Sequence, residues 1–400
     1  MNICFAYITP FHPERGGIGR VTHALTQEFL KRGHNIYYLI YPCAITIRHK
    51  FDYPAPLTYL PSSEALSIEN IEAYKQYLRN NKIDIVINQS GNFNDSELWV
   101  KCRELNIPII SVLHSTPWLS YNQFWHTDIF PLKNDSPLEK IKRIVRILLY
   151  PKLKSKLKRH RIDHFKTLLS QTDKVCMLSE NYFSELDQIY SGFSSKYLAI
   201  QNPNAYFESD IQKIYPKKKQ IIFIGLFGAP KKETLVLKIW KRIYQDFPDW
   251  NLVIIGDGPI DRKKRMLKLA KSLDRVSFTG FTNPLEYQLE SSIICITSMY
   301  EGWSMALTES MQCGVVPILF NSFAAAREIV KDNETGILVK PFSLTEYEIK
   351  LRELMSNDSL REKMSEAARL SIKRFDVEKI ADKWEKAINE LVSKRQNAST

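Results

Sequence analysis

The chain has 400 residues, of which 44% are hydrophobic and 25% are charged, and its formal net charge is +12 at pH 7. This composition is that of an ordinary globular protein with enough residues for two domain cores. No apolar run approaches the roughly 18 residues of a membrane span, and the first residues lack the basic segment of a signal peptide, so we expect a cytoplasmic chain. The six cysteines form no CxxC pair, which indicates reduced core residues and not metal ligands.

Strands and helices alternate along the first half of the chain. Short apolar runs bounded by polar residues predict buried strands. They lie at residues 3–8, 35–40, 83–88, 108–113 and 174–178. Helices such as residues 19–32 separate them, the alternation that is typical of a doubly wound parallel sheet. Residues 1–203 are therefore expected to form one Rossmann-like domain.

A second series of strands follows a polar stretch. Residues 204–219 end in three lysines and are predicted to be a hinge. The later strands are predicted at residues 220–224, 251–255, 276–279, 292–297 and 315–320. Residues 220–374 are therefore expected to form a second α/β domain.

The segment YEGWSMALTESMQCGVVP, residues 300–317, connects two strands of this second domain. A helix is predicted in it, and the turn before that helix lies outside the carboxyl end of a strand, where open α/β sheets bind ligands. Gly302 permits close approach, and the first helix amides suit a diphosphate. Glu301 and Glu309 would repel an anion, so they are expected to face sugar and ribose hydroxyls. The alternative is that Glu301 caps the helix and Glu309 lies on its solvated face.

At these residues the chain resembles the retaining glycosyltransferases of the GT-B fold, in particular glycosyltransferase family 4. Further segments that carry the resemblance, in the family's order, are PERGGIG, SVLHS, FIGLFGAPKK, VSFTGF and DNETGILVKP. It covers nearly the whole chain. It implies an α/β fold of two Rossmann-like doubly wound domains facing a central cleft, with the acceptor on residues 1–203 and the nucleotide-sugar donor on residues 220–374. It also implies that residues 375–400 form a helix that crosses back to the first domain.

The resemblance assigns catalytic roles to three residues. Glu301 would contact the transferred sugar, and His114, which follows an apolar strand, would reach the sugar or acceptor. The family pattern G-R-L-x-x-x-K-G retains only its lysine here, as Lys231 or Lys232, because Leu226 replaces the arginine that binds donor phosphates. The alternative for His114 is a histidine that is hydrogen-bonded at a strand end.

The resemblance also implies a donor site, which has more members than the three catalytic residues. Its members are Gly16, Gly17, Lys232, Phe281, Gly302, Trp303, Ser304, Met305 and Glu309. Glu309 would hold the ribose, and the backbone of Phe281 would meet the base. The alternatives are ordinary turn glycines at 16 and 17 and a buried aromatic at 281. Trp118 and Tyr121 could line an acceptor pocket, or could simply pack.

The implied reaction is transfer of a sugar from a nucleotide diphosphate sugar, with a UDP-sugar favoured, to an acceptor hydroxyl with retention. Lys231 and the helix amides can stabilise the leaving diphosphate. No Asp-x-Asp occurs in the chain, so no metal and no other cofactor is expected.

Residues 138–166 carry 11 Lys and Arg and two acidic residues. An apolar stripe repeats at helical spacing opposite Lys140, Arg143 and Arg146. A basic amphipathic helix of this kind predicts docking to the inner leaflet of the cytoplasmic membrane; the alternative is that the stripe packs on the first domain. Nucleic acid is not expected, because no recognition motif accompanies the basic run.

The sequence thus predicts a glycosyltransferase that acts on a lipid-linked oligosaccharide during assembly of a bacterial surface polysaccharide. Two alternatives remain open. One is another GT-B enzyme, a nucleotide-sugar epimerase or a phosphorylase. The other, suggested by Leu226, is a non-catalytic membrane-associated binding protein that retains the fold.

Overall fold

The computed structural model describes residues 1–14, 16–41, 51–119, 137–189, 191–211 and 216–397. The chain forms two compact units. Unit 1 consists of Met1–Pro203 and Val377–Thr400, and unit 2 of Asn204–Asp376. The expected linker, residues 204–219, falls in unit 2: Asn204 Nδ2 donates to Ile372 O at 2.9 Å, and the first strand of the unit begins at Lys218.

Unit 1 is built on a parallel sheet that, in the described residues, has seven strands in the order β3-β2-β1-β4-β5-β6-β7. The strands are β1 Asn2–Tyr7, β2 Asn35–Ile40, β3 Leu57–Tyr59, β4 Ile85–Asn88, β5 Ile109–Leu113, β6 Lys174–Met177 and β7 Tyr197–Ala199. The helices are α1 Gly17–Lys31, α2 Ile68–Asn80, α4 Pro137–Leu148, α5 Tyr150–Gln171, α6 Phe183–Ile189 and α15 Val377–Asn397. The order reverses at β1, which pairs with β2 on one side and β4 on the other. Such a reversal is a topological switch point, where the carboxyl ends of strands form a binding crevice.

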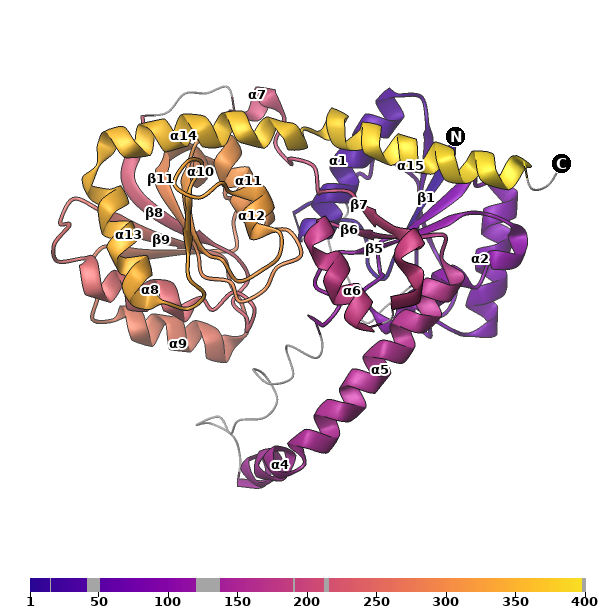
Figure 1. Ribbon diagram of the computed structural model, residues 1–400, viewed down its shortest axis with the longest axis horizontal. Coiled ribbons are helices and arrows are strands. Elements are labelled where there is room, and N and C mark those ends of the chain that lie inside the picture. The colour runs from indigo at the N-terminus through magenta and orange to yellow at the C-terminus, as the bar shows by residue number, and fades with distance from the viewer. Residues whose placement is uncertain (15, 42–50, 120–136, 190, 212–215, 398–400) are drawn as a thin grey trace. The chain divides into compact units, whose positions relative to one another are not determined.

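Unit 2 repeats this design with six strands in its described part, in the order β10-β9-β8-β11-β12-β13. The strands are β8 Lys218–Ile224, β9 Asn251–Ile255, β10 Val276–Gly280, β11 Ser291–Ile296, β12 Val316–Phe320 and β13 Ile337–Val339. The helices are α7 Glu208–Ile211, α8 Thr234–Ile243, α9 Ile260–Ala270, α10 Leu285–Glu290, α11 Met305–Gln312, α12 Ala326–Ile329, α13 Leu344–Ser356 and α14 Asp358–Ile372. Helices cover both faces of the sheet (Figure 1). Its reversal falls between β8 and β11.

Buried aromatic side chains hold the first sheet to α1. Phe5 of β1 stacks on Phe29 of α1 with ring centroids 6.4 Å apart, and meets Tyr38 of β2 edge-on at 6.3 Å. The Tyr38 hydroxyl donates to Thr26 Oγ1 at 2.7 Å, which satisfies a buried polar group. Aromatic residues of β1 and β2 therefore fix α1 against the sheet.

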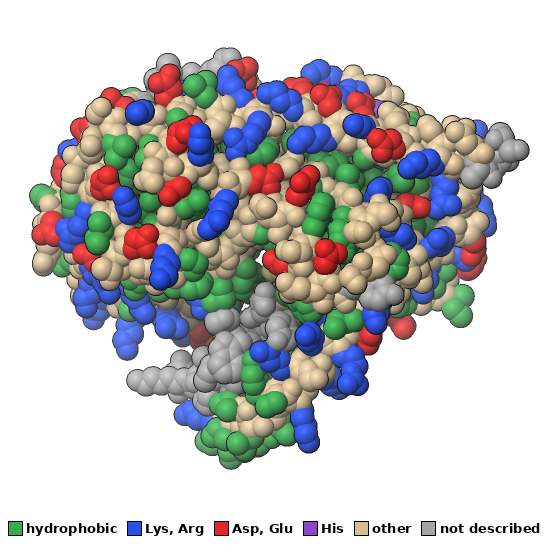
Figure 2. All heavy atoms as spheres, in the orientation of Figure 1, with side chains coloured by type: hydrophobic (Ala, Val, Ile, Leu, Met, Phe, Trp, Pro, Cys, Tyr) green, Lys and Arg blue, Asp and Glu red, His purple; other side chains and the backbone are tan. Residues whose placement is uncertain are grey.

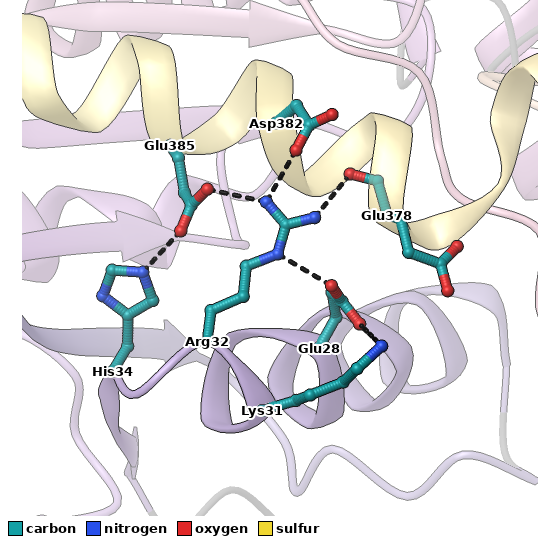
Figure 3. A network of polar contacts seen from close by, with 7 residues as sticks. All are labelled: Glu28, Lys31, Arg32, His34, Glu378, Asp382 and Glu385. Carbon is teal, nitrogen blue, oxygen red and sulfur yellow. Dashed lines mark hydrogen bonds and ion pairs between the residues drawn. The ribbon is translucent and has the colours of Figure 1, made fainter.

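The last helix, α15, belongs to unit 1 and lies against α1 (Figure 3). Arg32, at the end of α1, donates to Asp382 at 2.7 Å and to Glu385 at 2.6 Å, and its Nε donates to Glu28 at 2.7 Å. Glu385 also contacts His34 at 2.7 Å. One guanidinium with its fork of donors thus ties α15 to the first domain, where the resemblance predicts it.

Candidate functional site

The loop after β11 carries the residues expected to bind the donor. Thr297 and Ser298 continue the buried strand, and Ser304 is the N-cap residue of α11. The Ser304 side chain makes no capping hydrogen bond to the first amides of this helix, and the first turn of the helix holds no acidic residue. The Ser304 hydroxyl is itself buried without a hydrogen-bond partner in the same described part. This helix N-terminus therefore keeps its positive partial charge toward the loop.

Glu301 forms an ion pair with Lys231 across 70 residues of sequence. Lys231 Nζ lies 2.6 Å from Glu301 Oε1, and the Ser298 hydroxyl donates to the same oxygen at 2.6 Å. The pair is largely buried, with 23% and 15% of the two side chains exposed. Glu301 is therefore not the helix cap, and the alternative that it only caps α11 is wrong.

The loop that carries Lys231 is fixed against the end of β11. The amide of Met299 donates to Pro230 O at 2.6 Å, and Thr297 Oγ1 donates to Lys231 O at 2.9 Å. These bonds bring the segments after β8 and β11 together at the switch point of the sheet. The sequence did not single out Thr297, the last residue of a predicted strand, or Ser298, which directly follows it, although side chains at the end of a strand commonly reach a ligand.

Lys232 has a left-handed backbone, with φ of +48°. Glycine readily adopts this conformation and lysine does so only at a cost. In the pattern G-R-L-x-x-x-K-G glycine directly follows the lysine, so Lys232 occupies the glycine position. Lys231 is therefore the residue that matches the family's lysine. Leu226, at the arginine position, is 62% exposed.

Glu309 lies on α11, two turns after the ion pair, and is only 1% exposed. The alternative of a solvated helix face is therefore wrong for this residue. Gly302, Trp303 and Ser304 are buried as well, and Met305 is half-buried. A carboxylate buried at this depth requires hydrogen-bonding surroundings.

The loops after β8, β9 and β10 lie side by side. The amide of Gly225 donates to Ile255 O at 3.0 Å, and that of Gly256 to Gly280 O at 2.9 Å. Gly256 has a φ of +136°, and a Cβ there would lie 2.0 Å from Gly225 O, so only glycine fits. Phe281, at the end of this edge, is 60% exposed, so the alternative of a buried aromatic is wrong.

In unit 1, His114 follows β5 and is half-buried. Its Nε2 lies 2.5 Å from Oε1 of Gln89, the residue that follows β4. Burial lowers the pKa of His114 to about 3, so the imidazole is neutral near pH 7. With Nε2–H donating to Gln89, Nδ1 carries a lone pair that can accept a hydrogen bond from a hydroxyl group. Gln89 was not predicted, although it directly follows a strand.

The glycine-rich loop leads into α1. Gly16 is the N-cap residue with φ of +112°, and Gly17 begins the helix. No side chain caps this N-terminus within the described residues. Trp118 is half-buried, and its amide donates to Thr116 Oγ1 at 3.2 Å. Tyr121 lies outside the described residues.

The basic segment forms α4 and α5, and the apolar stripe of α4 is exposed. Leu148 is 76% and Ile141 58% exposed. Figure 2 shows hydrophobic side chains gathered on α4, with Lys and Arg beside them. Lys140 and Arg146 are exposed and Arg143 is half-buried. The alternative in which the stripe packs on the first domain is therefore wrong.

The described residues contain neither a membrane-spanning helix nor a metal-binding cluster. No helix in them has the length and apolarity to cross a membrane, and no group of three or more His, Cys, Asp or Glu in them could hold a metal ion. The cysteines in this part of the chain are free and buried, as expected, and burial raises the pKa of Cys102 to about 11.

The chain is similar to known glycosyltransferases. Residues 15–190 match the family described as Glycosyltransferase Family 4, and residues 206–371 match Glycosyl transferases group 1. An uncharacterized glycosyltransferase of Haemophilus influenzae is 30% identical over 217 residues, which are 53% of this chain and 60% of that protein. The chain thus spans little more than half the length of the curated relatives it matches.

Another relative is named for its substrate. The N-acetylgalactosamine-N,N'-diacetylbacillosaminyl-diphospho-undecaprenol 4-alpha-N-acetylgalactosaminyltransferase of Campylobacter jejuni is 30% identical over 222 residues, 54% of this chain and 59% of that protein.

Solved structures show the same fold over the whole chain. Sucrose-phosphate synthase from Thermosynechococcus elongatus superposes with a TM-score of 0.73 at 16% identity, covering 98% of this chain and 99% of that one. HepE of Anabaena, in complex with UDP and glucose, superposes with a TM-score of 0.71 at 15% identity, covering 98% and 100%. The expected α/β fold of two Rossmann-like domains is thus confirmed. The two family matches together run through both units: unit 1 matches glycosyltransferase family 4, unit 2 matches glycosyltransferases group 1, and the chain has the GT-B fold.

Proposed function

We propose that this protein is a retaining, metal-independent glycosyltransferase that moves a sugar from a nucleotide diphosphate sugar to a hydroxyl of a lipid-linked oligosaccharide. The observation that carries the proposal is the pairing of Lys231 with Glu301 beside the N-terminus of α11. This arrangement places a cation and helix amides, which suit a diphosphate, next to a carboxylate, which suits sugar hydroxyls.

Lys231 and the first amides of α11 would stabilise the charge that develops on the departing nucleoside diphosphate. They supply positive charge without a metal ion. Glu301 would hold the transferred sugar and Glu309 the ribose, with Gly302, Trp303, Ser304 and Met305 forming the cradle. Lys232 and the backbone of Phe281 would complete the donor site. A UDP-sugar is the favoured donor, a choice supported by the UDP bound to the similar HepE structure.

In unit 1, neutral His114 would accept a hydrogen bond from a hydroxyl of the sugar or acceptor. Gly16 and Gly17 at the N-terminus of α1 would contribute to donor binding, and Trp118 would line the acceptor pocket. The lipid-linked acceptor is supported by the Campylobacter relative, whose name specifies an undecaprenol diphosphate substrate. Assembly of a bacterial surface polysaccharide is the process that such a transfer would serve.

Helix α4 would bring the enzyme to that acceptor by docking on the inner leaflet of the cytoplasmic membrane. Its exposed apolar face can enter the interface, and Lys140, Arg143 and Arg146 can meet anionic headgroups. The exposure of the stripe supports this docking, because solvated apolar side chains at helical spacing are costly without a partner.

The experiment that tests the donor site is a titration of UDP, GDP, ADP and dTDP by calorimetry. Wild type is compared with Glu309→Ala and with Glu362→Ala, which removes an exposed carboxylate of the same unit. One nucleotide should bind wild type and Glu362→Ala, and should bind Glu309→Ala at least about tenfold more weakly. Equal binding to all three proteins would refute the role of Glu309.

A non-catalytic binding protein is the second candidate, and Leu226 is the observation that favours it. Leucine cannot donate to a phosphate, so the donor loop lacks one of its usual charges. If no nucleotide binds wild type, this candidate replaces the first. If a nucleotide binds, incubation of its sugar conjugates without acceptor distinguishes transfer from epimerisation.

A further inference from the structure

Arg161 marks the place where α5 enters unit 1. None of the described residues 150–160 is buried, whereas Arg161 is only 3% exposed, and buried positions recur from there to the end of the helix. Figure 1 shows α5 running out from the sheet of unit 1, with α4 at its far end. Arg161 is thus the first point at which the projecting basic segment, residues 137–160, is anchored in the domain.

The guanidinium of Arg161 bridges two loops at the carboxyl edge of the sheet. Nε donates to Pro117 O at 2.7 Å, in the loop after β5, and Nη1 donates to Asn92 O at 2.8 Å, in the loop after β4. Asn92 in turn accepts from the amide of Ser115 at 3.0 Å. One bond therefore joins α5 directly to the loop that begins at His114, and two more bonds connect α5 to that loop through Asn92.

The charge on Arg161 has no carboxylate partner among the described residues. Its other contact is the ring of Phe165, whose centroid lies 4.5 Å from Cζ, and Nη2 is buried without a hydrogen-bond partner in the described part. Burial lowers the pKa of Arg161 to about 10, so it stays charged at neutral pH. A buried charge without a counter-ion destabilises the folded protein. A protein with a well-packed apolar residue in its place is often no less stable. Unlike an apolar residue, the rigid guanidinium can donate hydrogen bonds to two carbonyl groups at once.

We propose that Arg161 is a positioning residue, which holds the His114 loop in place and couples that loop to the projecting basic segment. A force or restraint on α4 and the exposed half of α5 is transmitted through the helix to Arg161, and from there to Pro117 and Asn92. The coupling rests on the proposed membrane docking, whereas the positioning of the loop does not. Docking would thereby further order the acceptor side of the site when the enzyme is on a membrane.

The test is amide hydrogen exchange in Arg161→Met, Arg161→Lys and the control Arg159→Met. Arg159 lies two residues earlier on the exposed half of α5 and carries the same charge. In Arg161→Met the amides of Ser115 and Trp118 should exchange about fivefold to tenfold faster than in wild type, because two charge-assisted bonds to the loops are lost. Arg159→Met should leave these amides unchanged. Unchanged exchange in Arg161→Met would overturn the positioning role.

Arg161→Lys keeps the charge but cannot span both carbonyls, so it should also speed exchange, by a smaller factor. If Arg161→Met does not fold, Arg161→Lys alone tests the positioning role. Exchange equal to wild type in Arg161→Lys would then overturn that role.

The coupling is tested with vesicles of phosphatidylglycerol and phosphatidylethanolamine. They should slow exchange at Ser115 and Trp118 in wild type but not in Arg161→Met, although both proteins sediment with the vesicles. Equal slowing in the two proteins, or no slowing in a wild type that sediments, would overturn the coupling. A failure of the proposed donor function would show instead in the nucleotide titration of unit 2, which this experiment does not involve.

Discussion

The Nζ atom of Lys231 lies 2.6 Å from Oε1 of Glu301, so the cation expected to meet the donor diphosphate is held by the carboxylate expected to meet the donor sugar. The two residues lie on loops that follow neighbouring strands, β8 and β11. A diphosphate that approaches Lys231 therefore also approaches a negative charge. The pair orients both side chains, and it weakens the ground-state attraction for the nucleotide.

Glu301→Ala is expected to separate binding from transfer. Release of Lys231 should tighten UDP binding about fivefold, since removing one charge about 4 Å away is worth about 1 kcal/mol in water. Transfer, measured as UDP release from a UDP-sugar with extracted lipid-linked oligosaccharides, should fall about 100-fold or more. Glu301→Gln is the control of similar shape and should behave alike. Loss of UDP binding in both variants would contradict this account.

Leu226→Arg is expected to restore the missing phosphate contact. A guanidinium at this exposed position can form a charge-assisted bond to the diphosphate, so affinity for UDP should rise about tenfold. Affinity for uridine should not change. The matched control is Ile260→Arg, which adds the same charge at an equally exposed apolar residue of the same unit. A similar gain for both variants would show a general charge effect and not a restored contact.

Lys232→Gly is expected to stabilise the protein. The backbone φ of +48° at Lys232 destabilises the folded protein by about 1 kcal/mol, and glycine adopts the same φ without this loss. The denaturation midpoint should therefore rise without a change in the slope of the transition. Lys238→Gly, in the middle of α8, is the contrasting control and should lose about 1 kcal/mol. A lower midpoint for Lys232→Gly would show that the lysine side chain stabilises the loop by more than the backbone strain.

The sequence predicted the central strands because each is an apolar run between polar residues, and β1, β8 and β11 begin within two residues of the expected positions. It missed β3, β7 and β13, since three-residue strands at or near sheet edges have too few residues for a pattern. For the site, the sequence indicated the turn before α11. It could not predict the partner of Glu301, which lies 70 residues away, because spacing along a chain does not specify contacts across strands.

The apolar stripe of α4 also shows that a sequence pattern does not specify tertiary contacts. Helical periodicity identifies which residues share a face, here Ile141, Ile144 and Leu148, but it does not identify what covers that face. The structure shows the three side chains exposed.

His114 is expected to make stability depend on pH. Its pKa is lowered to about 3 by burial, whereas an unfolded histidine titrates at about 6.5. The unfolded state therefore binds more protons between these values, so stability is full above about pH 6.5 and falls as pH falls toward 3. His114→Gln should lose less stability than wild type between pH 6.5 and 4, as measured by urea denaturation. His160→Gln, on the exposed half of α5, should follow wild type. Parallel curves for wild type and His114→Gln would show that folding does not lower the pKa of this histidine.

Neutralising the basic face of α4 is expected to weaken membrane binding. In the triple variant Lys140→Gln, Arg143→Gln, Arg146→Gln, each lost charge removes about 1 kcal/mol of attraction to anionic lipid. The affinity for phosphatidylglycerol-containing vesicles, measured by sedimentation, should therefore fall about 100-fold. The apolar stripe should retain some affinity.

The control removes three exposed lysines elsewhere, in the triple variant Lys241→Gln, Lys363→Gln, Lys386→Gln, so that the net charge is the same. It should bind the vesicles like wild type. If both triple variants lose binding equally, attraction comes from the net charge of +12 and not from α4. Ile141→Ser with Leu148→Ser separates the apolar contribution: it should weaken binding to the same vesicles even at high salt, where screening has removed most of the attraction between charges.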